Sequence, residues 1–138
     1  MSDFDLDRFL AAQESDWPQA RAEIAAGRKT GHWIWYVWPQ LAGLGSSARS
    51  QYFGLAGLDE AAAYLAHPVL GPRLSDISEL LLSHAEVPAR DILGDVDAAK
   101  VRSSATLFSR VPDAPGVFVR VLAAFYDGKP DPRTLERL

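Results

Sequence analysis

The amino-acid sequence predicts an all-α fold, a compact single-domain bundle of about seven or eight helices over residues 1–138. Three observations lead to this prediction. Apolar residues recur at helical spacing along most of the chain, glycine or proline ends most of these segments, and no two convincing strands are available to pair. The chain has 138 residues, 48% of them hydrophobic, which is enough for one buried core.

Two helices separated by a break are predicted at the N-terminal end. The segment Asp3–Ala12 has acidic residues near its positive end and presents Phe9 to the core. Asp16 is the expected N-cap of the second helix, which has Pro18 in its first turn and ends at Gly27.

The segment 29–50, KTGHWIWYVWPQLAGLGSSARS, holds three of the four tryptophans. So much aromatic area forms either the centre of a core or the wall of a pocket, and the sequence does not choose between them. The apolar run Trp33–Trp38 fits a buried strand or a buried helix. Because no second strand is available, we favour a helix that ends at Pro39. Ser46 or Ser47 is expected to cap a short turn after the following loop.

The remainder of the chain is predicted to be helical, with breaks at prolines and glycines. Apolar stripes of period 3.6 mark the longer segments, and Asp95 is the expected cap of the helix that begins at Val96. The predicted segments are Leu58–Ala66, Leu70 or Pro72 to about His84, a single turn at Ala89–Leu93, Val96–Arg110, Val117–Tyr126 and a short helix started by Asp131-Pro132.

Short motifs are spread over nearly the whole chain. They are Gly31-His32-Trp33, Pro39-Gln40-Leu41, Gly43-Leu44-Gly45, Ser50-x-Tyr52, the segment Leu58 to Leu74, Asp97-x-x-Lys100-x-x-Ser103-Ser104 and Asp131-x-x-Thr134-Leu135. Together they resemble the signature of the bacterial domain-of-unknown-function family eighteen-ten, sometimes mislabelled calpastatin. The resemblance implies a compact, essentially all-helical single domain and no assigned biochemical function.

Composition argues against several kinds of partner and site. A net charge of −4 does not suit nucleic-acid binding, which needs a basic face. The acidic N-terminus lacks a signal-peptide pattern and no long apolar run occurs, so we expect no membrane association and a cytoplasmic location. The chain has no cysteine and its three histidines are isolated, so neither a metal site nor a cofactor is predicted. The oligomeric state stays open.

Two segments of this acidic chain contain no acidic residue, namely 24–58 and 98–112. If the two segments meet, they form a locally positive and partly aromatic surface that suits an anion. Chance clustering on a solvated face is the alternative.

The candidate catalytic residues are His32 and Glu60. The imidazole of His32 suits acid or base chemistry near neutral pH, and the alternative is a histidine hydrogen-bonded at a helix start. Lys100 and Ser104 share a helix face and offer a weak base–nucleophile pair. The alternative is that Ser103 and Ser104 bond to carbonyls one turn back.

These observations favour a binder of a small anionic ligand, a nucleotide or a phosphorylated metabolite, in a pocket of aromatic and basic residues. Trp33 or Trp35 would stack on the ligand, Gln40 would read a polar edge, and a cation would meet phosphate. If a reaction follows, hydrolysis is the first to test, and whether the chain is an enzyme stays open. The alternative is a protein–protein interaction module without catalytic activity. The candidate ligand-binding residues are Lys29, His32, Trp33, Trp35, Gln40, Arg49, Lys100, Ser103 and Ser104.

Overall fold

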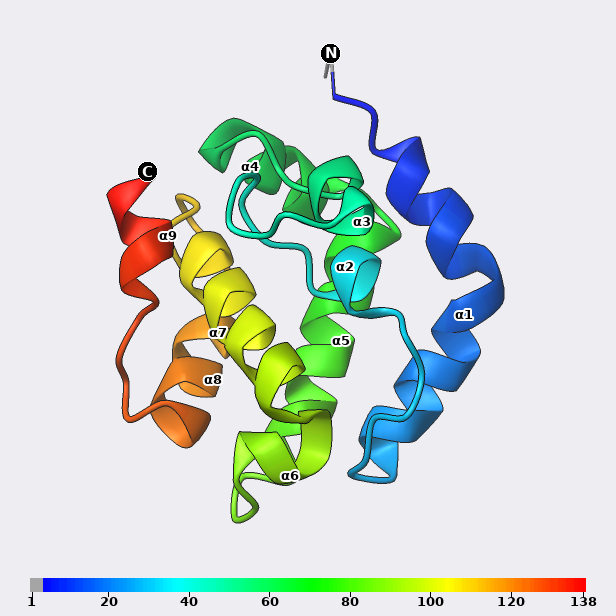
Figure 1. Cartoon of the computed structure of the whole chain (residues 1–138), viewed down its shortest axis with the longest axis vertical. Helices are drawn as coiled ribbons and strands as arrows, with labels where there is room; N and C mark the ends of the chain where they lie inside the picture. Colours follow the sequence, from blue (N-terminus) through cyan, green and yellow to red (C-terminus); the bar gives the residue numbers. More distant parts are fainter. Residues whose placement is uncertain (1–3) are drawn as a thin grey trace.

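A computed structural model describes residues 4–138, and this part of the chain contains nine α-helices and no strand. The all-α prediction is confirmed, with one helix more than the upper end of the expected range (Figure 1). The helices are α1 (Asp7–Ala25), α2 (Ile34–Val37), α3 (Ala48–Tyr52), α4 (Leu58–Ala66), α5 (Leu70–Leu82), α6 (Ala89–Leu93), α7 (Asp95–Ser109), α8 (Val117–Phe125) and α9 (Pro132–Glu136).

The prediction of two N-terminal helices is wrong, because α1 is one helix that continues through Pro18. Proline removes one backbone donor, but the buried positions Phe9, Gln13, Ala20 and Ile24 stay in phase on both sides of it. Packing of this continuous face outweighs the lost hydrogen bond. Asp16 therefore lies inside the helix, where its carboxylate accepts a hydrogen bond from the Tyr36 hydroxyl. The predicted start at residue 3 lies outside the described residues.

Several predicted boundaries are confirmed. Segments α4 and α6 have the predicted limits, and the Trp33–Trp38 run is helical over α2. The Ser47 side chain accepts a hydrogen bond from the Ser50 amide at the start of α3, and Asp131 caps α9 in the same way through Thr134. Asp95, however, is the first residue of α7 rather than its cap, since Gly94 takes the cap position with φ 84°.

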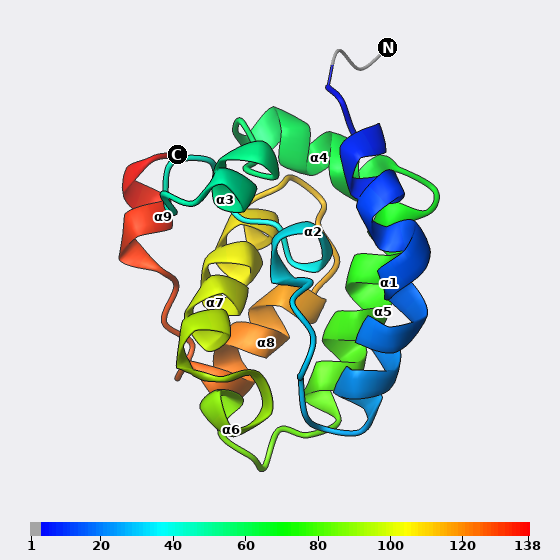
Figure 2. The ribbon, with the colours of Figure 1, turned by 45° about the vertical axis from the view of Figure 1, so that its right-hand side comes forward.

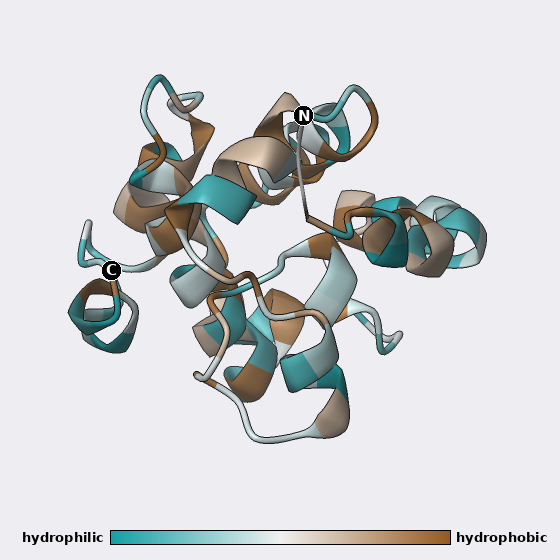
Figure 3. Ribbon diagram, turned by 90° about the horizontal axis from the view of Figure 1, so that it is seen from above, coloured by the Kyte–Doolittle hydropathy of each residue, from teal (hydrophilic) through white to brown (hydrophobic). Residues whose placement is uncertain are grey.

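Helices α5 and α7 organise the bundle. Helix α5 packs against α1, α4 and α8, while α7 packs against α4, α6, α8 and α9. Figure 2 shows α1 and α5 running side by side, with the short α2 lying between this pair and α7. Hydrophobic and hydrophilic residues alternate along the longer helices in Figure 3, as expected when each helix buries one face.

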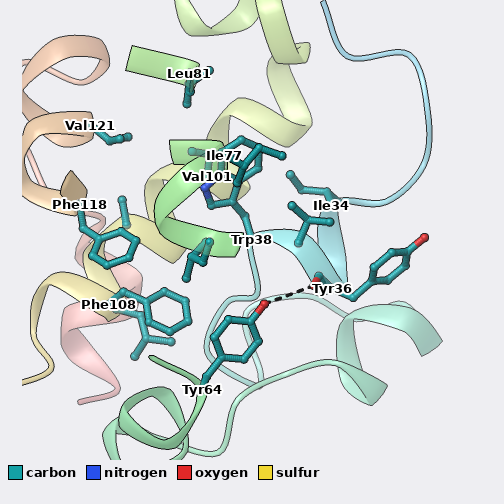
Figure 4. Packing of buried hydrophobic residues seen from close by; sticks show 14 of the residues in the cluster. Ile34, Tyr36, Trp38, Tyr64, Ile77, Leu81, Val101, Phe108, Phe118 and Val121 are labelled. Carbon is teal, nitrogen blue, oxygen red and sulfur yellow. Dashed lines mark hydrogen bonds between the residues drawn. The ribbon is translucent and has the colours of Figure 1, made fainter. Parts of the chain in front are cut away.

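Much of the aromatic segment belongs to the core. The indole rings of Trp33 and Trp38 are almost fully buried and stacked, with centroids 6.1 Å apart. The Trp38 Nε1 donates to Ser78 on α5 at 3.0 Å. Figure 4 shows Trp38 amid residues of several helices, and the dashed line joins the Tyr64 hydroxyl to the backbone carbonyl of Tyr36. The sequence left core and pocket open, and the structure assigns Trp33 and Trp38 to the core.

A pair of backbone hydrogen bonds closes the loop that contains α3. The Leu55 amide donates to the Gln40 carbonyl at 3.0 Å, and the Ala42 amide donates to the Leu55 carbonyl at 2.8 Å. Leu41 and Leu55 thus form an isolated parallel bridge. These bonds hold the backbone of Gln40 in place and do not involve its side chain.

None of the helices described over residues 4–138 combines the length and the hydrophobicity that crossing a bilayer requires.

Candidate functional site

The turn before α2 is built around the carboxylate of Glu23. Its Oε1 accepts hydrogen bonds from the amides of Thr30 and Gly31 at 2.8 and 2.9 Å and from the Trp33 indole at 3.0 Å, while Oε2 accepts from Gln19 at 2.7 Å. Burial alone would raise the pKa of Glu23, but these donors, led by the Gly31 amide, lower it to about 2. The carboxylate therefore fixes the start of the aromatic segment.

Lys29 joins this turn to α7. Its Nζ lies 2.7 Å from the Asp97 carboxylate, donates to the Gly31 carbonyl and sits over the Trp33 ring, 4.7 Å from the centroid. Its side chain is only 4% exposed. The charge of Lys29 is thus paired with Asp97, and the Trp33 ring packs against Lys29 and Trp38 inside the protein. We therefore leave Lys29 and Trp33 out of the site proposed below.

Trp35 is placed differently from the other tryptophans of the segment. The Arg49 guanidinium and the Lys100 ammonium lie over its ring, 4.9 and 5.1 Å from the centroid. Its Nε1 is buried, yet it has no hydrogen-bond partner among residues 4–138. Over the same described range, neither Arg49 nor Lys100 forms an ion pair with a carboxylate. The two segments without acidic residues therefore do meet, at Trp35.

A small cavity lies beside the Trp35 ring. Its volume is about 10 Å³, enough for one water or one ligand oxygen. Its polar lining comes from Trp35, Gln40, Ser50 and Lys100, and its apolar lining from Ile34, Trp38 and Phe53. The Ser50 hydroxyl accepts from Ser47 at 2.9 Å, which leaves its own hydrogen free to donate.

A larger cleft of about 350 Å³ shares two lining residues, Gln40 and Lys100, with the small cavity. The shared residues place the cavity and the cleft next to each other. The cleft runs between the 40–45 loop, α7 and the start of α9. The rest of its lining is Leu44, Gly45, Val96, Ala99, Arg102, Ser103, Asp131 and Arg133.

Positive charge exceeds negative charge in this cleft, since Lys100, Arg102 and Arg133 face one carboxylate, Asp131. Arg102 donates to the carbonyls of Lys129 and Pro130, and Arg133 donates to the Leu44 carbonyl at 3.0 Å. Among residues 4–138, neither arginine forms an ion pair with a carboxylate. The cleft is therefore locally positive on an acidic protein.

The two serines of α7 differ. Ser103 lines the cleft and donates to the Ala99 carbonyl one turn back and to Asp131, both at 3.2 Å. Ser104 is fully buried, and its hydroxyl has no partner within the described part of the chain. The back-bonding alternative thus holds for Ser103 and not for Ser104. In residues 4–138, no hydrogen bond joins Lys100 to either serine.

The two candidate catalytic residues lie away from this cleft. His32 is exposed and lines neither the cavity nor the cleft. Glu60 is buried, pairs with Arg8 at 2.9 Å and accepts from the Ala56 amide at 2.8 Å. Its carboxylate ties the start of α1 to the start of α4. Neither residue is positioned to act on a ligand in the cleft.

Sequence reasoning did not select four of the polar or charged residues that line the cavity or the cleft, which are Ser50, Arg102, Asp131 and Arg133. The basic character of the 98–112 segment pointed to Arg102, and the capping pattern of the terminal helix pointed to Asp131 as a structural residue. No sequence signal brings the terminal helix next to the 40–45 loop.

Over residues 4–138, no group of three or more His, Cys, Asp or Glu side chains is placed so that it could hold a metal ion.

Comparison with known proteins places the chain in a family. The family described as "Protein of unknown function (DUF1810)" matches residues 3–138. The chain belongs to this family. The resemblance noted from the sequence motifs is thereby confirmed.

A solved crystal structure supports the fold of this DUF1810 chain. It is the crystal structure of the conserved hypothetical protein Rv1873 from Mycobacterium tuberculosis, to which the chain is similar with 44% sequence identity. The TM-score is 0.97, and the match covers 99% of this chain and 98% of that chain. Comparison with curated proteins gives no match.

Proposed function

We propose that this chain binds a small anionic ligand whose negatively charged group lies at the small cavity, between Trp35 and Lys100. The observation that carries the proposal is the buried Nε1 of Trp35, which has no acceptor among residues 4–138 although the Trp35 side chain lines a cavity that Lys100 also lines. A buried donor without an acceptor is costly, and an oxygen of the ligand supplies the missing partner.

The rest of the lining supports an acceptor-rich ligand. The Ser50 hydroxyl and the Gln40 amide have donors to offer, and Lys100 has three. Such a set suits a phosphate or a carboxylate, because charge-assisted hydrogen bonds to an anion are about twice as strong as neutral ones. Lys100 and Gln40 also face the larger cleft, which accommodates the remainder of the molecule.

The test is whether the protein binds inorganic phosphate, sugar phosphates or nucleotides. Binding is measured by thermal shift and by titration calorimetry. A ligand that binds only the folded state raises the melting temperature. For any anion that binds, Lys100→Met is expected to weaken the affinity at least about tenfold, the effect of losing one charged hydrogen bond. Trp35→Phe removes the indole donor and is expected to weaken it about threefold to tenfold.

Lys129→Met is the matched control, since it removes the same charge from an exposed side chain that lines neither the cavity nor the cleft. Its affinity is expected to stay within about twofold of the wild-type value. The proposal fails if none of these anions binds, or if Lys129→Met weakens binding as much as Lys100→Met does.

The interaction-module alternative stays a prediction. The large apolar side chains that are exposed within residues 4–138 are Tyr52, Val69, Val96, Val119 and Leu138, and they belong to five different parts of the fold. No specific observation favours a protein-binding face over the cleft.

A further inference from the structure

The ligand class can be narrowed by asking what the cleft offers to a nucleobase. None of the residues that line the 350 Å³ cleft is aromatic. Trp33 and Trp38 stack on each other inside the core, and the ring of Trp35 is covered by Arg49 and Lys100. A base bound in the cleft would therefore have no aromatic ring to stack on, although stacking is the usual source of affinity for a base.

The cleft offers instead the groups that recognise hydroxyls. The Asp131 carboxylate accepts from Ser103 and Thr134 at its Oδ2, which holds it in place beside the cleft. The Asp131 carboxylate and the lone pairs of the Ser103 hydroxyl, whose own hydrogen is already donated, provide acceptors for the hydroxyl groups of a polyol, which can donate. A bare anion would interact unfavourably with Asp131, because the two negative charges repel each other.

The cleft also has an aliphatic part to its lining, made of Leu44, Val96 and Ala99. Such a surface suits the C–H groups of a sugar or polyol chain. The volume of about 350 Å³ lies at the small end of the range of about 300–1,000 Å³ that is typical of ligand pockets.

We infer that the ligand is a phosphorylated sugar or polyol without a nucleobase. Its phosphate lies against Lys100 and the Trp35 indole, and its hydroxyls bond to Ser103 and Asp131 further along the cleft. This inference rests on the proposed function, because it presumes that the cleft binds an anion at Lys100.

The test is calorimetric titration of the wild-type chain with four probes: inorganic phosphate, ribose 5-phosphate, glucose 6-phosphate and AMP. At least one sugar phosphate is expected to bind about tenfold or more tightly than inorganic phosphate, the effect of one to two added hydrogen bonds. AMP is expected to bind no more tightly than ribose 5-phosphate, since the two share the phosphorylated ribose and differ in the base.

Two variants locate the two parts of the ligand. Ser103→Ala is expected to weaken the affinity for the sugar phosphate about threefold to tenfold. The affinity of this variant for inorganic phosphate is expected to stay within about twofold of the wild-type value. Lys100→Met is expected to weaken both. The far-ultraviolet circular dichroism spectrum and the melting temperature show whether each variant folds. If a variant does not fold, the titrations of the wild-type chain with the four probes still test the inference.

The outcomes separate the two claims. If AMP binds more tightly than both sugar phosphates, or if inorganic phosphate binds as tightly as they do, the sugar phosphate inference is overturned while anion binding at Lys100 stands. If no probe binds, the proposed function itself is overturned.

Discussion

Replacing Glu23 by glutamine tests how the aromatic segment is held. Four donors converge on the carboxylate of Glu23, and two of them are the backbone amides of Thr30 and Gly31. They lower its pKa from 4.5 to about 2, although burial acts in the opposite direction. Glutamine keeps the shape of the side chain and removes its charge. The variant therefore isolates the electrostatic contribution of the Glu23 carboxylate to these hydrogen bonds.

The expected loss follows from that pKa difference. One pKa unit corresponds to about 1.4 kcal/mol, which gives an upper limit of about 3 kcal/mol for the stabilisation at neutral pH. Because Glu23 is partly exposed, solvent screening reduces this value, and we expect Glu23→Gln to lower the free energy of unfolding by about 1–2 kcal/mol at pH 7.

The stabilisation by Glu23 is expected to depend on pH. The folded-state pKa of Glu23 is depressed, so its contribution is fully present above the unfolded-state value near 4.5 and is lost as the pH falls toward 2. Urea denaturation at pH 7, 5, 4 and 3 should show the gap between wild type and Glu23→Gln shrinking below pH 4.5. Glu86→Gln, at an exposed position, is the control and should show no gap. A gap of constant size down to pH 3, or no gap at pH 7, would refute the reasoning.

Three further substitutions probe the packing. A Cβ at Gly71 would lie 2.1 Å from the Leu65 carbonyl oxygen, so Gly71→Ala must displace backbone and should cost about 3 kcal/mol, or about 10 °C in the melting temperature. Gln13→Ala removes a buried amide that donates to the Tyr36 carbonyl at 2.5 Å, and should cost about 2–3 kcal/mol in urea denaturation. Trp38→Phe breaks the bond to Ser78 and should cost about 1–3 kcal/mol by the same assay.

Each of these substitutions has a matched control. Gly57→Ala introduces a Cβ with nothing within 4 Å, and Gln51→Ala removes an exposed amide. Trp17→Phe changes a half-buried indole outside the stacked pair. All three should change the unfolding free energy by less than about 1 kcal/mol. Equal losses in a variant and its control would contradict the packing argument for that site.

Much of the fold could be predicted because local signals agree with the tertiary structure. Apolar spacing and a proline or glycine stop define α4 and α6, and a capping aspartate defines the start of α9. The prediction is wrong at α1, where Asp16 and Pro18 resemble the cap and first turn of a new helix but lie inside a continuous one. The in-phase positions Phe9, Gln13, Ala20 and Ile24 were the signal of continuity, but a polar glutamine among them hides the stripe.

The candidate site was harder to predict because burial is a tertiary property. Lys29 and Lys100 look alike in sequence, yet one is paired with Asp97 inside the protein and the other has no carboxylate partner among residues 4–138. Trp33 and Trp35 are separated by one residue and face different surroundings for the same reason. The contribution of Arg133 depends on α9 packing near the 40–45 loop, which no local pattern encodes.

The backbone bridge at Leu41 and Leu55 bears on how this scaffold can change over time. It secures the main chain at Gln40 independently of the Gln40 side chain, which faces both the cavity and the cleft. Mutation at this position should therefore cost little in stability. If the cleft binds a ligand as proposed, natural selection or a designed library can change its ligand preference here while the architecture stays the same.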